Sequence, residues 1–367
     1  TATKEVVYVL ERQGFIRPHM ADENDKRTIY MVDMHEPLMF LHNLDTTIKE
    51  PFASNPAVLD AVEKNHKKLQ IAMTKLYPGN LVLSLSSGIM YHRLVDRITA
   101  LNDVPREPLV PRRLGKNMCV PFGKILRGKV VPNTVTKTLH TDKVYEPDLN
   151  SFTIEPFPYY SPLKSQIETI KSFDRPVILV DDLVHTANRL QVLVPQLREY
   201  GIPIKKVVVG VLSGYGRDLM QCLKVPVESI YSMPNLRQWF VESTLYPFIG
   251  GDTVRREEMK VAGLQPSINM ILPYATPRLS GCSREALVEF SACCIENSRD
   301  LFQVLEAEYR KMYAKNLTLS RLSEAVILPL CPDKGSCMEY DENLAASVYL
   351  ENDLETLWRM KEFLIKG

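Results

Sequence analysis

Two adjacent carboxylates, Asp181 and Asp182, stand at the end of a short apolar run, Val177 to Val180. Such a run predicts a buried strand, and the apolar-periodic segment that follows and ends at Gly201 predicts a helix. Two acids at the end of a buried strand are costly to desolvate unless they bind something. Hydroxyl groups, a divalent metal ion or a cationic group would each serve, and the residues alone leave these alternatives open.

The composition excludes several classes of protein. The chain has 367 residues and 45% hydrophobic content, which suits two or three packed domains. Its 45 Lys and Arg against 44 Asp and Glu give a net charge of +1, so we expect neither nucleic acid nor membrane as a partner. No apolar run reaches the roughly 18 residues of a membrane helix. The seven cysteines are scattered without zinc-type spacing, which favours reduced thiols and a cytoplasmic location. Because the first residue is Thr1, we expect a piece of a longer protein.

Strand-like runs alternate with helical periodicity on both sides of the acid pair. Leu81 to Leu85 predicts a strand, Ser86-Ser87-Gly88 a tight turn and Ile89 to Leu101 a helix. Another buried strand is predicted at Lys206 to Ser213. This alternation predicts the α/β class, with a parallel sheet flanked by helices and ligands at the carboxyl ends of the strands.

We divide the chain into three parts from these patterns. Residues 1–54 form an N-terminal appendage, residues 55–254 an α/β core, and residues 255–367 a largely helical C-terminal region. Within the core, residues 105–162 are rich in Pro, Lys and Arg and show little periodicity. So long an irregular stretch inside a compact domain is typical of a mobile functional loop.

The segment around the acid pair resembles the signature of the type I phosphoribosyltransferases. That signature is an apolar run, two acids, two more apolar residues and a phosphate loop rich in Thr and Gly. Here it stands as Val177–Val180, Asp181-Asp182, Leu183-Val184 and His185–Arg189. The resemblance implies a phosphoribosyltransferase-like fold, a phosphoribosyl pyrophosphate-type ligand, Mg²⁺ as cofactor and transfer of the phosphoribosyl group to an unknown acceptor. Asp181 and Asp182 would face the ribose hydroxyls, directly or through Mg²⁺.

The resemblance implies that the next residues hold the 5′-phosphate, at the start of a helix where backbone N–H groups favour an anion. These residues are Thr186, Ala187, Asn188 and Arg189. Thr186 matches the family pattern, whereas Ala187 replaces the usual Gly and Arg189 the usual Thr or Ser. Arg189 would either supply a cation to the phosphate or fill its pocket. His185 would act as an acid or base near neutral pH, or else face solvent or cap the helix.

Two further segments are placed by the same resemblance. Ser86, Ser87 and Gly88 lie where the family has its pyrophosphate-binding turn, and their N–H groups could form an anion site. Residues 127–143 resemble, by position and content, the flexible loop that closes over pyrophosphate. Lys137 would then stabilise the leaving group, whereas the alternative is an ordinary solvated lysine.

Several alternatives accompany this interpretation. The same fold could serve as a non-catalytic module that senses a nucleotide or phosphosugar. A receiver-like signalling domain also places two acids after a strand, but the strand at Lys206 to Ser213 ends without the required Asp. Leu10–Phe15 and Tyr30–Met34 resemble the last strands of an N-acetyltransferase-like domain. Aromatic and glycine residues at 235–252 could line an acceptor pocket or an oligomer interface, such as that of a homodimer.

Overall fold

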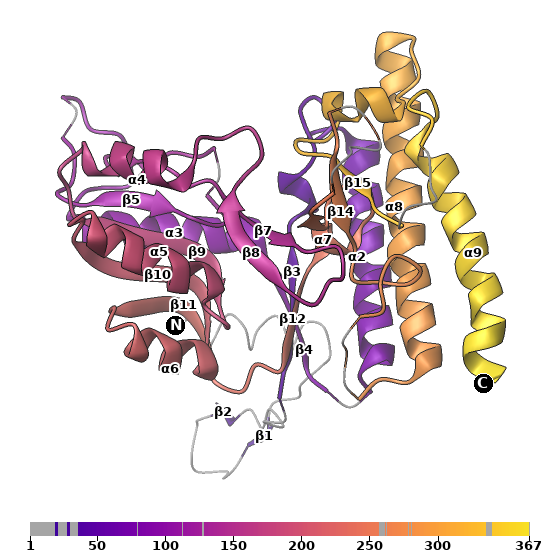
Figure 1. The fold of residues 1–367 in the computed structure, drawn as a ribbon, viewed down its shortest axis with the longest axis horizontal. Helices are drawn as coiled ribbons and strands as arrows, with labels where there is room; N and C mark the ends of the chain where they lie inside the picture. The colour runs from indigo at the N-terminus through magenta and orange to yellow at the C-terminus, as the bar shows by residue number, and fades with distance from the viewer. Residues whose placement is uncertain are drawn as a thin grey trace. The chain divides into compact units, whose positions relative to one another are not determined.

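The computed structural model (Figure 1) describes residues 19–20, 28–29, 36–78, 80–111, 113–126, 128–256, 261, 263–277, 279, 281–334 and 340–366. They belong to two compact units, and the chain passes between these units several times. The first unit comprises Thr1–Met39, Leu85–Asp142 and Ile154–Trp239, and the second comprises Phe40–Ser84, Lys143–Thr153 and Phe240–Gly367. The units therefore interleave in sequence, and their limits do not coincide with the expected boundaries after residues 54 and 254.

A five-stranded sheet forms the centre of the first unit. Its strand order is β11 (Val227–Met233), β10 (Ile204–Ser213), β9 (Val177–Val184), β5 (Met118–Pro121) and β6 (Val135–Thr136). All the neighbouring strands are parallel. The near-continuous Val, Ile and Leu content of β9 and β10 is what burial on both faces requires. The predicted α/β class is confirmed.

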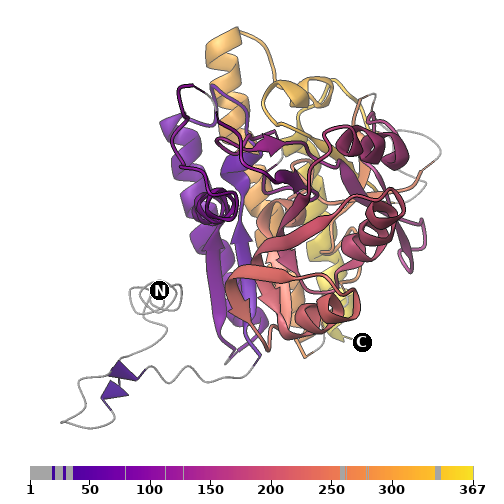
Figure 2. The ribbon, with the colours of Figure 1, turned by 90° about the vertical axis from the view of Figure 1, so that its left-hand side faces the viewer.

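Four helices accompany this sheet: α3 (Ser87–Leu101), α4 (Leu163–Lys171), α5 (Asn188–Glu199) and α6 (Gly214–Cys222). The strands lie between α3 on one side and α4, α5 and α6 on the other (Figure 2). The core on the latter side joins side chains of the central strands with Ile167 of α4, Leu193 of α5 and Met220 of α6. This layering leaves the ends of the strands as the places where polar groups can gather.

The stretch 105–162, expected as one long irregular loop, contains four strands. Besides β5 and β6 they are β7 (Thr141–Tyr145) and β8 (Phe152–Pro156). Backbone hydrogen bonds continue the pairing of β5 with its neighbour, from Lys137 N to Cys119 O (3.0 Å) and from Leu139 N to Pro121 O (2.9 Å). Strands of two to five residues are too short to show periodicity in sequence.

The second unit combines long helices with a small mixed sheet. Its helices are α2 (Pro56–Leu76), α7 (Glu242–Leu245), α8 (Arg284–Tyr313) and α9 (Ala346–Lys366), with 3₁₀ turns at Leu44–Thr46 and Leu319–Glu324. Its sheet has the order β15 (Leu330–Pro332), β14 (Gln265–Ile268), β13 (Asp252–Val254), β7 and β8. In this unit α8 packs between α2 and α9. The C-terminal region is thus not purely helical, because β14 and β15 lie within it.

The helix ends in this unit follow from local chemistry. Asn55 caps α2, since its side-chain oxygen accepts hydrogen bonds from Ala57 N (2.8 Å) and Val58 N (3.4 Å) ahead of Pro56 at the first helical position. Ser283 caps α8 through Ala286 N (3.1 Å). These caps fix where the two long helices begin.

The division between the units falls inside five strands. Two of them are β7 and β8, and the other three form a sheet of order β12 (Gln238–Val241), β3 (Leu38–His42) and β4 (Val82–Ser86). At the N-terminus, β1 (His19–Met20) pairs antiparallel with β2 (Thr28–Ile29). The segments expected to resemble an N-acetyltransferase-like domain, 10–15 and 30–34, lie outside the described residues.

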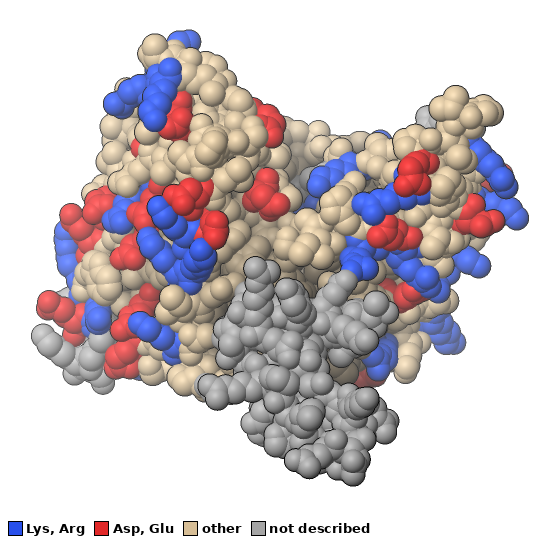
Figure 3. Space-filling model, turned by 180° about the vertical axis from the view of Figure 1, so that it is seen from behind, with Lys and Arg blue, Asp and Glu red and all other residues tan. Residues whose placement is uncertain are grey.

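Surface charge and hydropathy agree with the composition. On the face drawn in Figure 3, Lys and Arg side chains are interspersed with Asp and Glu side chains, in keeping with the net charge of +1. Among the described residues, none of the helices combines the length and apolar character needed to cross a membrane.

Candidate functional site

The acid pair lies at a reversal in the strand order of the first unit. From β5 the chain adds β6 on one side, then returns to place β9, β10 and β11 on the other. The reversal therefore falls between β5 and β9, and in open parallel sheets ligands bind beyond the carboxyl ends of the two strands at such a point. Asp181 and Asp182 lie near that end of β9, although the strand continues through them to Val184.

Asp181 is held in a space that a glycine leaves open. A Cβ added to Gly123, two residues beyond β5, would stand 1.6 Å from Asp181 Oδ1. Asp181 Oδ1 also accepts a hydrogen bond from Asp182 N (2.8 Å). Only 3% of Asp181 is exposed, whereas Asp182 is half-buried. The buried carboxylate can therefore occupy this position only because Gly123 has no side chain.

The electrostatics of the pair favour a bound cation or hydroxyl. Burial raises the pKa of Asp181 well above its usual range, and the neighbouring Asp182 carboxylate raises it further. The Arg189 guanidinium opposes this, with Nη1 lying 3.8 Å from Asp181 Oδ2. A buried carboxylate with one distant counter-ion can still gain from a ligand that brings donors or positive charge.

The loop after β9 turns sharply into α5. Ala187 has φ of +50°, in the left-handed region that favours glycine, and it occupies the N-cap position of α5. The departure from the family pattern at this position therefore retains a glycine-like backbone. Thr186 is exposed, and its hydroxyl accepts a hydrogen bond from Asn188 Nδ2 (2.9 Å). The first backbone N–H groups of α5 follow directly, which is the usual arrangement at an anion-binding helix start.

Arg189 is directed toward Asp181. Its side chain is 25% exposed, and its Nε is buried without a hydrogen-bond partner among the described residues. The two expectations for Arg189 were a cation for the phosphate and a side chain that fills the pocket. In the structure it serves as counter-ion to the acid pair, an alternative that sequence reasoning did not include.

His185 contacts the start of the next helix. Its Nδ1 lies 2.9 Å from Ser213 Oγ, and Ser213 caps α6 by accepting a hydrogen bond from Gly216 N (3.0 Å). Burial lowers the pKa of His185, which favours a neutral imidazole at pH 7. Its ring centroid lies 5.9 Å from that of Tyr215, whose side chain is exposed. A neutral imidazole beside the acid pair can accept a proton.

The predicted pyrophosphate turn begins α3 without an intervening loop. β4 ends at Ser86, and Ser87 and Gly88 are the first residues of α3. β4 belongs to the three-stranded sheet, so the strand beside the acid pair is β5 rather than β4. Met90 of α3 lies near the backbone of the pair, because a Cβ on Gly210 would meet both Met90 Sδ (2.0 Å) and the Asp182 carbonyl oxygen (2.6 Å).

Lys137 follows β6 by one residue and lies beside β5, before the end of that strand at Pro121. Its backbone N–H donates to Cys119 O, which fixes the main chain beside β5, while its side chain is exposed. This position differs from the flexible loop that the sequence predicted. Sequence reasoning also missed Gly123 and Ser213. An apolar run that ends in a glycine, Met118 to Gly123, was the available signal for the former.

The similarities of this chain to known proteins are distant. No protein-family model matches the chain, and no curated protein matches it. Among solved structures, a purine phosphoribosyltransferase from Pyrococcus horikoshii is similar with 14% identity and a TM-score of 0.25, over 42% of this chain and 87% of that one. A hypoxanthine phosphoribosyltransferase from Trypanosoma cruzi, in complex with the product IMP, has 14% identity and a TM-score of 0.24, over 47% of this chain and 80% of that one. The description of the fold rests on the sheet and helices themselves.

Proposed function

We propose that the carboxyl end of β5 and β9 binds a phosphoribosyl pyrophosphate-type ligand with Mg²⁺ and that the protein transfers the phosphoribosyl group to an acceptor. The observation that carries the proposal is the position of Asp181 and Asp182 at the reversal of strand order, next to the left-handed turn that begins α5. A carboxylate pair and a helix start are complementary to the two ends of such a ligand, its hydroxyls and its phosphate.

Each group has a role in this proposal. Asp181 and Asp182 accept from the ribose hydroxyls or hold Mg²⁺, for which carboxylate oxygens are suitable ligands. The 5′-phosphate binds at residues 186–189. The start of α3 at Ser86–Gly88 and the side chain of Lys137 face the pyrophosphate, where positive charge stabilises the leaving group. His185 accepts the proton of the acceptor nucleophile.

A second function, ligand sensing without catalysis, is favoured by Arg189. Because this cation is directed to Asp181, Mg²⁺ must compete with it for the carboxylate. A module that binds a nucleotide or phosphosugar through the loop and helix starts alone would not need to displace it.

Isothermal titration of the full chain with phosphoribosyl pyrophosphate and Mg²⁺ tests the binding. The test variant is Asp181→Asn/Asp182→Asn, and the matched control is Glu199→Gln, which neutralises an exposed carboxylate in the last turn of the helix that follows β9, α5. We expect binding in the wild type and the control and its loss in the double variant. No heat at millimolar ligand, or equal binding in all three, would refute the proposed site.

A second measurement separates the two functions. Pyrophosphate release is followed with a panel of nucleophiles as acceptors in the presence of the same ligand. Release that depends on Asp181 and Asp182 supports transfer, whereas tight binding without release for any acceptor supports the sensing module. The homodimer and the cytoplasmic location stay predictions.

A further inference from the structure

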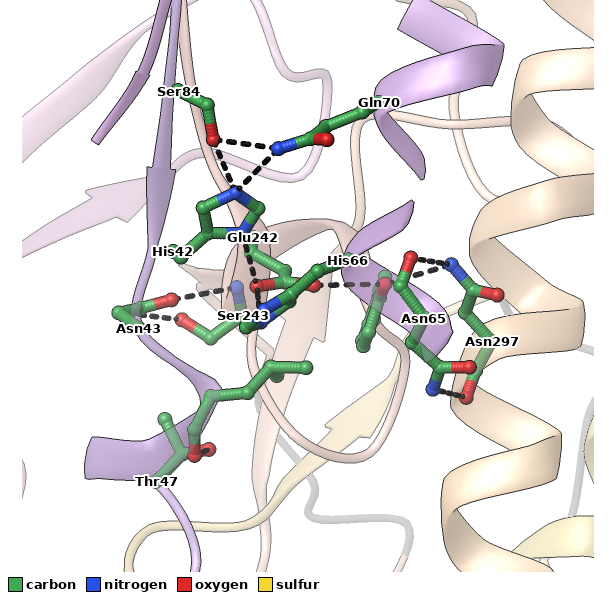
Figure 4. A network of polar contacts seen from close by, with 12 residues as sticks. His42, Asn43, Thr47, Asn65, His66, Gln70, Ser84, Glu242, Ser243 and Asn297 are labelled. Atoms are coloured by element: carbon green, nitrogen blue, oxygen red, sulfur yellow. Dashed lines mark hydrogen bonds and ion pairs between the residues drawn. The ribbon is translucent and has the colours of Figure 1, made fainter. Parts of the chain in front are cut away.

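A second polar cluster lies in the other unit, where two histidines converge on one buried glutamate (Figure 4). His42 is the last residue of β3, His66 lies in the middle of α2, and Glu242 begins α7 immediately after β12. The pairing of β12 with β3 brings the first and last of these together from positions 200 apart in the chain. No spacing motif could have predicted this cluster.

Both imidazoles approach the same carboxylate oxygen. His42 Nδ1 lies 3.1 Å and His66 Nε2 lies 2.7 Å from Glu242 Oε2. One nitrogen or oxygen from each of the three side chains lies within 4.8 Å of the others. Ligand atoms about 2.0 to 2.2 Å from a shared metal ion are about 2.8 to 3.1 Å apart in octahedral geometry and about 3.3 to 3.6 Å apart in tetrahedral geometry. The two distances to Oε2 are close to these values, and the two ring nitrogens, which lie within 4.8 Å of each other, would have to approach for an ion to bind.

The glutamate serves both histidines through one oxygen. His66 Nε2 is buried and forms a close ion pair with Oε2, at 2.7 Å, and the same oxygen lies 3.1 Å from His42 Nδ1. A metal ion bound between the three groups would take the lone pairs of both ring nitrogens and of the carboxylate, so that each of the three groups keeps a partner.

The surroundings of the cluster orient its members. Tyr246 donates its hydroxyl hydrogen to Glu242 Oε1 (3.1 Å) and in turn accepts from Asn297 Nδ2 (2.9 Å), so Oε2 is the oxygen left for the histidines. On the other side, His42 Nε2 contacts Ser84 Oγ, which accepts from Gln70 Nε2 (2.9 Å). Hydrogen bonds to the far sides of ligating groups are typical of metal sites, where they fix ring orientation.

Charge and access also fit a cation. The Glu242 side chain is fully buried, so its negative charge requires compensation. The His42 and His66 side chains are 12% and 25% exposed, which leaves an approach from solvent. Two imidazoles and one carboxylate are the ligands of zinc or of non-haem iron, whereas Mg²⁺ and Ca²⁺ prefer oxygen ligands throughout.

We propose that His42, His66 and Glu242 bind one divalent transition-metal ion and leave at least one coordination position open to solvent. This site lies wholly within the second unit and is independent of the ligand proposed for the acid pair in the first. Its ligand set admits Zn²⁺, Fe²⁺, Co²⁺ and Mn²⁺ and discriminates against Mg²⁺.

The test is metal binding by the full chain after removal of metals with a chelator. Co²⁺ is titrated while its visible absorption is recorded, and Zn²⁺ and Mg²⁺ are then added in competition. The variants are His66→Ala, which removes a partly exposed ligand, and Glu242→Gln, which keeps an oxygen for Tyr246. The matched control is His92→Ala, an exposed histidine of the first unit.

We expect one equivalent of Co²⁺ to bind to the wild type and to the control, with displacement by Zn²⁺ but not by Mg²⁺. Each ligand variant should lose at least about a hundredfold in affinity, more than the 10- to 100-fold typical of outer-shell changes. Zn²⁺ should also raise the melting temperature of the wild type but not of His66→Ala. No binding at micromolar metal, or equal affinity in His66→Ala and wild type, would overturn the proposal and leave a hydrogen-bonded cluster only.

Discussion

The fit between Gly123 and Asp181 allows a quantitative test of how the acid pair is built. In Gly123→Ala the new Cβ would lie 1.6 Å from Oδ1, 2.4 Å from Cγ and 2.8 Å from Oδ2 of Asp181. Because these three atoms are its nearest neighbours, the carboxylate has to move. Overpacking costs about 1 to 3 kcal/mol. Loss of the hydrogen bond from Asp182 N adds about 1 kcal/mol, so the unfolding free energy should fall by about 2 to 4 kcal/mol.

A double-mutant cycle isolates the contact. In Asp181→Ala the three obstructing atoms are absent, so the further change Gly123→Ala should cost less than about 1 kcal/mol. The coupling between the two positions should therefore be about 2 kcal/mol. Urea unfolding followed by circular dichroism gives the free energies, and hydrogen exchange in β5 and β9 shows whether the loss is local. An equal loss from Gly123→Ala in both backgrounds would refute the reasoning, because the glycine would then be needed for the backbone alone.

Three further predictions concern single residues. Ala187→Gly should stabilise the protein by about 0.5 to 1 kcal/mol, because residue 187 has a left-handed backbone. Ala307→Gly, on the exposed face of α8, should instead cost about 1 kcal/mol. Urea unfolding of the two variants measures the difference, and equal losses of stability would contradict the prediction. Burial raises the pKa of Glu306, so the folded chain holds this proton more tightly than the unfolded chain, and that stability is lost as pH rises from about 4.3 through the raised pKa. Melting curves over pH should show Glu306→Gln gaining on the wild type as pH rises, and parallel curves would exclude the effect. Exposed Cys222 should react with a thiol reagent at pH 8 before Cys293, because burial raises the pKa of Cys293 to about 12; mass spectrometry of early time points measures the order.

Local pattern was sufficient for the central part of the first unit. The apolar run before Asp181 and the periodicity after it predicted β9 and α5, because burial on both faces of a parallel strand requires a continuous apolar sequence. The helical content expected for residues 255–367 is present in α8 and α9. The cost of burying two adjacent acids marked their position as a candidate site before any neighbour was known.

The sequence pattern did not predict which strands pair with one another. The sequence predicted a strand at residues 81–85 but not its partners, and β4 joins the three-stranded sheet, whereas β5 pairs with the acid-bearing β9. Strand pairing depends on contacts between distant segments, which local periodicity does not encode. The short strands within 105–162 were missed for the related reason that two to five residues show no period.

The α/β class, the helical character of the C-terminal region and the acid pair could be predicted, since each depends on side chains close together in the chain. The interleaving of the two units, the direction of Arg189 toward Asp181 and the meeting of His42 with Glu242 are visible in the folded chain alone. The physical reason is the same for all three. The tendency of a segment to be buried and its local hydrogen bonds depend on residues that are near in sequence. The partner of a charged group or of a metal-binding side chain comes from a segment distant in sequence, which folding brings beside it.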